Sequence, residues 1–205
     1  MLSNKDISLA SKWTAYMVLV VSILLFGSEA WTLRIDDLRR LATFHHAAVR
    51  RICGVTLWHR RRTEDLLRSI GPRAASIDHY LAARQLRWAG HVARMDSERL
   101  PRLVMFSWLP HARAQGGRYM TWGDRLLGNL NKFPVSILAG LRGRGHGRSP
   151  AALKAALLTN WPTYAMEHKD AWRTNVVAVA PGRLGGLIPR PRPKRQADRQ
   201  RQQHQ

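Results

Sequence analysis

Residues 77–95 read IDHYLAARQLRWAGHVARM, and this stretch decides the fold class. Its apolar side chains recur at helical spacing on two sides, and a helix with two apolar faces is expected to lie between neighbouring helices. The sequence therefore predicts a mainly α-helical fold, a small bundle of about four to six helices. Gly90 would permit close approach of another backbone, and Trp88 is interpreted as a core residue rather than a base-stacking platform. The two sides consist of Ile77, Leu81, Trp88, Val92 and Met95, and of Ala82, Leu86, Ala89 and Ala93.

The remaining strip of the same helix is polar. Arg87, His91 and Arg94 follow one another at steps of four and three, so their side chains share one side of the helix. We interpret this strip as a candidate contact for the phosphate backbone of a nucleic acid.

A second helix is expected over roughly residues 33–53. Thr32 can cap its start, and Gly54 is placed to end it. Asp36 and Asp37 fall in the first turn, where the helix dipole favours negative charge. These start and stop signals agree with the periodicity between them.

The two faces of this helix differ in character. Opposite its apolar stripe, Arg39, Arg40, Arg50 and Arg51 form a ridge of two pairs. Because eleven residues make about three turns, each later arginine lies about 16 Å beyond its earlier mate. We interpret the ridge as a candidate nucleic-acid contact, with a solvated charged face as the alternative. The stripe consists of Leu38, Leu41, His45, Ala48, Val49 and Ile52.

A short helix is expected after a run of basic residues. Arg60, Arg61 and Arg62 precede Thr63, which can cap a helix that ends at Gly71-Pro72. A phosphate bound there would meet the arginine side chains and the unpaired amides of the helix N-terminus. We therefore expect a local anion site at these three arginines.

The charge balance points to a polyanionic partner. The chain has 205 residues, with 34 Lys and Arg against 13 Asp and Glu, which gives a net charge of +21. Of the 34 basic residues 28 are Arg, the side chain that forks onto phosphates and stacks on bases. This balance excludes an ordinary acidic enzyme as the default, although a GC-rich coding sequence would also enrich Arg. With Cys53 as its single cysteine, the chain can form no internal disulfide and no multi-cysteine zinc site.

Residues 15–26 read AYMVLVVSILLF and form the most apolar stretch of the chain. Twelve residues fall short of the roughly 20 that a membrane-spanning helix needs. We expect a buried strand or helix of the core. A secretory signal stays open as an alternative, because Lys5 and Lys12 precede the run and Ser28-Glu29-Ala30 loosely imitates a cleavage site.

The chain is predicted to divide into five parts. Residues 1–12 form a flexible N-terminus, 13–130 a helical domain, 131–150 a Gly/Arg-rich loop, 151–180 a short helical segment and 181–205 a disordered basic tail. In the short segment a helix is expected from Ser149-Pro150 to about Thr159, ending before Trp161-Pro162.

Four segments resemble the region downstream of the reverse transcriptase domain in non-LTR retrotransposon polyproteins. Their order and spacing match this region best over about residues 18–130, and the third segment is the most specific. They are LLFGSEAW at 24–31 with LRRL at 38–41 and Phe44; RRICGV at 50–55 leading to Trp58; LRWAGHVARM at 86–95 with Leu100-Pro101; and a weak echo at 165–173.

The resemblance implies an all-helical, thumb-like, RNA-binding appendage of a polymerase rather than the polymerase itself. The aromatic-x-Asp-Asp hairpin that holds the metal ions of that family is missing, and we interpret Asp36 and Asp37 as helix-dipole partners. We therefore expect no enzyme activity, no cofactor, no metal and no small-molecule substrate. After the third segment the chain departs from the family pattern, keeping only part of a Gly-Arg-Pro turn and Trp helix at 116–126.

The sequence thus favours a non-catalytic fragment that binds the RNA or DNA backbone in a nuclear or cytoplasmic ribonucleoprotein, with a polymerase domain encoded upstream as a possible partner. Membrane contact is not expected to be its role. Two alternatives stay open. One is a signal-led or membrane-associated basic protein, and the other is an unpaired scaffold fragment without nucleic-acid binding.

Overall fold

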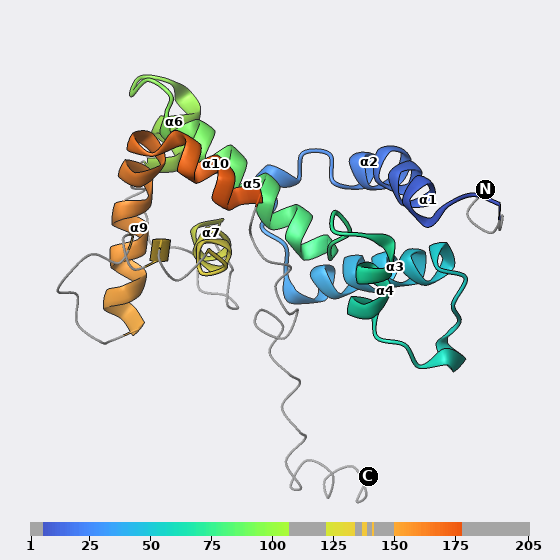
Figure 1. Ribbon diagram of the computed structural model, residues 1–205. Coiled ribbons are helices and arrows are strands. Elements are labelled where there is room, and N and C mark those ends of the chain that lie inside the picture. Colours follow the sequence, from blue (N-terminus) through green and yellow to red (C-terminus); the bar gives the residue numbers. More distant parts are fainter. Residues whose placement is uncertain (1–5, 107–121, 134–136, 139–140, 142–149, 178–205) are drawn as a thin grey trace, which may run out of the picture.

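A computed structural model describes residues 6–106, 122–133, 137–138, 141 and 150–177, with side chains left aside at 150–155 and 177. Every regular element in these ranges is a helix (Figure 1), which confirms the mainly α-helical prediction. The predicted loop at 131–150 is described only at 131–133, 137–138, 141 and 150, and the partial Trp-helix pattern at 116–126 only from residue 122. The predicted tail at 181–205 lies outside the described residues. The helices are α1 (Leu9–Tyr16), the π-helix η1 (Met17–Val21), α2 (Ser22–Leu24), the 3-10 turn η2 (Ser28–Ala30), α3 (Ile35–Ile52), the 3-10 turn η3 (Leu57–His59), α4 (Thr63–Ile70), α5 (Ile77–Ala93), α6 (Leu100–Phe106), α7 (Trp122–Leu130), α9 (Pro150–Glu167) and α10 (Lys169–Val177).

Helix α5 runs between two groups of helices (Figure 1), and each group packs a hydrophobic core. Its first residue, Ile77, belongs to a core made with α1, α3 and α4, whereas Ala83 to Ala93 belong to a core made with α7, α9 and α10. Both apolar faces of α5 are therefore covered, as its sequence predicted. Trp88, interpreted as core, is half-buried and meets the Trp122 ring edge-on at 5.2 Å between centroids.

Buried polar groups tie the two cores together along α5. The amide of Gln85 donates to the carbonyl of Trp31 at 2.9 Å and accepts from Asn129 Nδ2 at 2.7 Å. Two turns earlier in α5, Asp78 pairs with Lys132 Nζ at 2.5 Å. Because buried polar atoms are costly unless paired, these contacts fix how α7 and the 28–31 turn sit against α5.

Helix α3 begins and ends close to the predicted residues. Its N-cap is Arg34 rather than Thr32, and no side chain caps it. At its other end the N–H of Gly54 donates to the carbonyl of Arg51, and that of Val55 donates to the carbonyl of Arg50. This pair of bonds is the Schellman motif, and Gly54 adopts the left-handed φ of 65° that the motif needs.

The apolar run at 15–26 is helical, but it is not buried as a whole. Residues 9–12, placed in the flexible N-terminus by the sequence, already belong to α1. Tyr16, Val21 and Leu25 are buried, whereas the opposite face of η1 and α2 is open because nothing in the described chain packs on it. None of the described helices is both long and apolar enough to cross a bilayer. The open face consists of Val18, Leu19, Val20, Ile23 and Phe26.

The C-terminal helices depart most from the sequence prediction. Helix α9 continues through Pro162 to Glu167 instead of ending before Trp161. Trp161 and Ala165 are buried against α5 and α7, so tertiary burial outweighs the local cost of an internal proline. Leu141, expected in a flexible loop, is fully buried and accepts a hydrogen bond from Asn160 Nδ2 at 2.8 Å. The segment predicted as 151–180 thus packs directly onto α5.

Gly90 allows a close approach, but of a side chain rather than a backbone. A Cβ atom built on Gly90 would lie 2.2 Å from Nε1 of Trp172, which is buried. The same Nε1 donates to the carbonyl of Leu86 at 3.1 Å. Helix α10 therefore contacts α5 where α5 has no side chain.

Candidate nucleic-acid interface

Helix α1 is held against α3 by a buried histidine. His45 accepts from or donates to two partners at 3.0 Å each, the hydroxyl of Tyr16 and the carbonyl of Ala75. Because a carbonyl only accepts, Nε2 of His45 carries the proton and Nδ1 accepts from Tyr16. Burial lowers the pKa of His45 to about 4 and raises that of Tyr16 to about 12, so both are neutral at pH 7. Trp13 packs edge-on against the imidazole at 5.8 Å.

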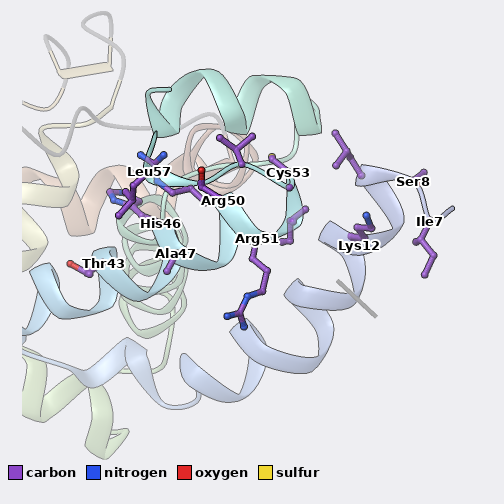
Figure 2. A pocket seen from close by; sticks show the side chains of 15 residues that line it. Ile7, Ser8, Lys12, Thr43, His46, Ala47, Arg50, Arg51, Cys53 and Leu57 are labelled. Carbon is purple, nitrogen blue, oxygen red and sulfur yellow. The ribbon is translucent and has the colours of Figure 1, made fainter. Parts of the chain in front are cut away.

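This packing leaves a groove of about 1210 Å³ between α1, α3 and the turn after α3. Figure 2 shows Lys12 from α1 and Arg50 and Arg51 from α3 around it. Of the described residues that line it, none is acidic. The groove is therefore a basic cavity with apolar walls. It is lined by Ile7, Ser8, Leu9, Lys12, Thr43, His46, Ala47, Arg50, Arg51, Ile52, Cys53, Gly54, Val55, Thr56 and Leu57.

The charges of the groove are incompletely compensated. Lys12 is 6% exposed. Arg50 donates through Nη2 to the carbonyl of Arg61 at 3.1 Å, while its Nη1 is buried and has no partner among the described residues. Arg51 is exposed. A buried cationic group without a carboxylate is costly, and a bound anion would offset that cost.

Two further groups of the groove are uncharged. Burial and the neighbouring Arg50 lower the pKa of His46 below its usual 6.5, so its imidazole is neutral at pH 7. Burial raises the pKa of the Cys53 thiol, which keeps it protonated. A thiol is a poor nucleophile, so the groove is suited to holding an anion by charge and hydrogen bonds rather than to thiolate chemistry.

The turn from Thr56 to Arg62 forms the outer rim of the groove. Nδ1 of His59 lies 2.9 Å from Oγ1 of Thr56 and accepts from its N–H at 3.2 Å, which closes a capping box. Arg60 adopts a left-handed φ of 47°, uncommon for a residue other than glycine. The carbonyl of the next residue, Arg61, accepts the hydrogen bond from Arg50. The arginine triplet is thus attached to the groove.

The structure brings five of the sequence-predicted arginines together and separates the others. Arg50 and Arg51 line the groove, and the exposed triplet Arg60, Arg61 and Arg62 adjoins it. The start of α4, which follows the triplet, differs from the prediction at its cap. Thr63 does not cap that helix, whose N-cap is Arg62, and its first turn carries two acidic side chains at 64 and 65.

Arg39 and Arg40 lie at the far end of α3 from the groove. Arg39 pairs with Asp36 at 2.9 Å, so much of its charge is compensated locally. Arg40 is exposed. The predicted ridge is therefore uneven, with an unpaired basic end at the groove and a paired end near the start of α3.

The residues of the polar strip on α5 differ in their surroundings. Arg87 and His91 are exposed. Arg94, by contrast, donates through Nη1 to the carbonyl of Ala165 at 2.9 Å, in the last turn of α9. Burial and the nearby Arg173 lower the pKa of Arg94. Its position at the negative end of the α9 dipole explains a structural role, which separates it from the candidate contact surface.

Lys12 and His46 were not among the predicted site residues. Lys12 adjoins the apolar run, and His46 follows the core residue His45. Neither lies in a basic cluster of the sequence. Only the packing of α1 on α3, across nearly 40 intervening residues, places Lys12 in the same groove as Arg50 and Arg51.

No group of three or more potential ligands that could hold a metal ion occurs in the described ranges. Both ring nitrogens of His45 are engaged by Tyr16 and Ala75, and Nδ1 of His59 is engaged by Thr56.

Comparison with known proteins finds similarity over part of the chain. It is 34% identical over 112 residues to a Caenorhabditis elegans protein described as an uncharacterised transposon-derived protein. The match covers 53% of this chain and 40% of the relative, so the chain spans less than half the length of that relative. No protein-family profile matches the chain, and no solved structure matches it. The chain is therefore similar in sequence to a transposon-derived protein.

Proposed function

We propose that this chain is a non-catalytic, nucleic-acid-binding part of a retrotransposon reverse transcriptase polyprotein that contacts the phosphate backbone of RNA or DNA. The acid-free groove at Lys12, Arg50 and Arg51 is the observation that carries the proposal. Phosphate contacts from lysine and arginine position a protein on nucleic acid without reading its sequence. The match to a transposon-derived protein agrees with a partner of this class.

The groove and its rim together offer a path for a phosphate backbone. The groove offers unpaired positive charge at fixed positions, because α1 and α3 are locked by His45. The exposed triplet at 60–62 extends that charge outward along the rim. A phosphodiester chain carries one charge per nucleotide, so a strand passing from groove to rim could meet several of these groups in succession.

The proposal includes no chemistry on the bound strand. The family pattern that holds two metal ions is missing from the sequence, and the groove contains a protonated thiol and a neutral imidazole. An upstream polymerase domain would supply catalysis, and a nuclear or cytoplasmic ribonucleoprotein would be the setting.

Salt dependence tests the proposal. With about six phosphate contacts the logarithm of affinity should fall with the logarithm of salt at a slope of about −5 on duplex DNA and about −4 on a single strand. Fluorescence anisotropy on labelled RNA and DNA between 50 and 300 mM salt, roughly the range where counterion release dominates, measures it. A flat response, or extension of a primer with dNTPs, would contradict the proposal.

Charge-removal variants separate the groove from the general positive charge. Arg51→Ala should weaken binding to all sequences alike and reduce the slope by about 1. The triple variant at 60–62 should reduce it by about 3. Arg68→Ala is the matched control, because Arg68 is also exposed but pairs with Asp65 at 3.1 Å. If the control weakens binding as much as Arg51→Ala, the groove is not the contact.

A second candidate function rests on the open apolar face of η1 and α2. Ile23 and Phe26 are 74% and 83% exposed, and the chain spans less than half of its relative. A scaffold segment that packs on another part of a longer protein would use such a face. If this second function holds, the parent protein should self-associate in analytical ultracentrifugation and should not bind nucleic acid. Replacing both Ile23 and Phe26 by Ser should then remove the self-association.

A further inference from the structure

Trp58 is the most exposed large hydrophobic side chain of the described residues. It is 92% exposed, and Leu57 beside it is 76% exposed. Indole rings usually bury most of their surface, because the apolar area is worth about 25 cal/mol per Å² when it leaves water. An indole presented to solvent next to a basic groove is therefore a feature to be explained.

The turn fixes the backbone from which this indole projects. The capping box between Thr56 and His59 closes on either side of it, and the N–H of Arg60 donates to the carbonyl of Leu57 at 3.0 Å. The left-handed Arg60 costs backbone energy, and such strain persists where the surroundings fix it. The bond from Arg50 to the carbonyl of Arg61 anchors the end of the turn to α3.

Basic residues flank Trp58 along the chain, with Arg50 and Arg51 before it and Arg60, Arg61 and Arg62 after it. Leu57 lines the groove that contains Lys12 and Arg51, and the triplet at 60–62 begins two residues after Trp58. A ligand that spans this surface must supply negative charge, then a flat apolar face, then negative charge again. Single-stranded nucleic acid has this pattern, because its unpaired bases are free to stack on an aromatic side chain between phosphate contacts. In a duplex the base faces are already stacked on each other.

We propose that Trp58 is a base-stacking platform and that the groove and its rim prefer single-stranded to double-stranded nucleic acid. This inference rests on the proposed backbone binding and adds the class of strand. Trp58, rather than Trp88, takes the stacking role, since Trp88 is half-buried and contacts Trp122. The stack orients one nucleotide, while the arginines hold its flanking phosphates.

The test compares one strand in two states. A fluorescein-labelled, non-self-complementary RNA of about 12 nucleotides is titrated alone and annealed to its complement, a length within the range of known single-strand sites. Trp58→Ala should weaken binding of the single strand roughly 5- to 150-fold and leave duplex binding within about twofold. Trp58→Phe, which keeps a flat ring, should retain most of the affinity for the single strand.

Two controls separate stacking from charge and folding. Binding to inorganic polyphosphate, which has charge but no bases, should not change in Trp58→Ala. Phe26→Ala removes another exposed aromatic ring, 83% exposed and outside the groove lining, and should leave all affinities unchanged. The melting temperature of Trp58→Ala should equal that of the parent, because so little of Trp58 is buried.

The outcomes distinguish this inference from the proposed function. If the parent binds neither RNA form nor polyphosphate, backbone binding itself fails. If it binds them but Trp58→Ala loses nothing, or loses single strand and duplex equally, the stacking platform is refuted while backbone binding stands. Anionic phospholipid vesicles serve as a further probe. If Trp58→Ala weakens binding to these vesicles but not to RNA, the stacking platform is refuted and Trp58 is assigned to a membrane surface.

Discussion

Replacement of Gly90 by Ala is the sharpest test of how the C-terminal helices pack on α5. The added Cβ would lie 2.2 Å from Nε1, 2.7 Å from Cδ1 and 2.9 Å from Cε2 of Trp172, all atoms of the five-membered ring. Real Cβ atoms do not approach other atoms so closely. Trp172 is 1% exposed and meets Phe133 edge-on at 5.4 Å and Trp161 at 6.0 Å, so its ring has no free direction in which to move.

Three contributions determine the expected loss of stability. Forcing a methyl group into a packed core costs about 1–3 kcal/mol. Displacing the indole breaks its bond to the carbonyl of Leu86 and leaves a buried N–H unpaired, which costs about 1–3 kcal/mol. Alanine favours the helix over glycine by about 1 kcal/mol, which offsets part of the loss. The free energy of unfolding should therefore fall by about 3 kcal/mol, or about 6–12 °C in melting temperature.

Urea unfolding followed by circular dichroism measures this change, and a double-mutant cycle assigns it. Trp172→Phe removes Nε1, so Gly90→Ala should cost at least about 1 kcal/mol less in that background than in the parent. A Gly90→Ala variant that is as stable as the parent, or more stable, would refute the packing of α10 on α5. Equal costs in both backgrounds would show that Trp172 is not the obstacle.

Three other perturbations test the core and the surface. The pKa of His45 is about 4 in the folded chain and 6.5 when unfolded, so the unfolded chain takes up the proton first as the pH falls. The free energy of unfolding should therefore decrease by up to about 3 kcal/mol between pH 6.5 and pH 4. In His45→Asn, the melting temperature should depend less steeply on pH in this window. Asp78→Asn leaves Lys132 buried without its counter-ion and should lower the free energy of unfolding by about 3–5 kcal/mol, whereas an unchanged urea midpoint would contradict burial of the pair. Arg39→Ala breaks an exposed pair and should change stability by no more than about 0.5 kcal/mol; a loss above 1 would argue for a larger role.

The sequence predicted most of the local structure because local signals agree with one another. The helix at 35–52 was expected within two residues, since its apolar stripe, its acidic first turn and Gly54 point to the same bounds. The apolar faces of α5 are buried as predicted. Helix α9 was misjudged, because a local rule at Pro162 was outweighed by burial of Trp161.

The candidate site was only partly predictable. Arg50 and Arg51 were expected to lie together on the basic ridge opposite the apolar stripe, yet Arg50 turns to the carbonyl of Arg61 and is half-buried. Lys12 joins them through a helix that the sequence placed partly in a flexible segment. The exposure of Trp58 carries no sequence signal, because an aromatic residue in a short apolar stretch is most often buried.

Taken by itself, the sequence determined the helical class, the large positive charge and the ends of helix α3, because periodicity, composition and capping are properties of residues near one another in the chain. Tertiary structure alone decided which basic groups share a groove, which face of the apolar run stays open and why Gly90 tolerates no side chain. These outcomes depend on contacts such as those of Trp172 with α5, between residues more than 80 positions apart, and no local pattern specifies which distant surface will cover a given face.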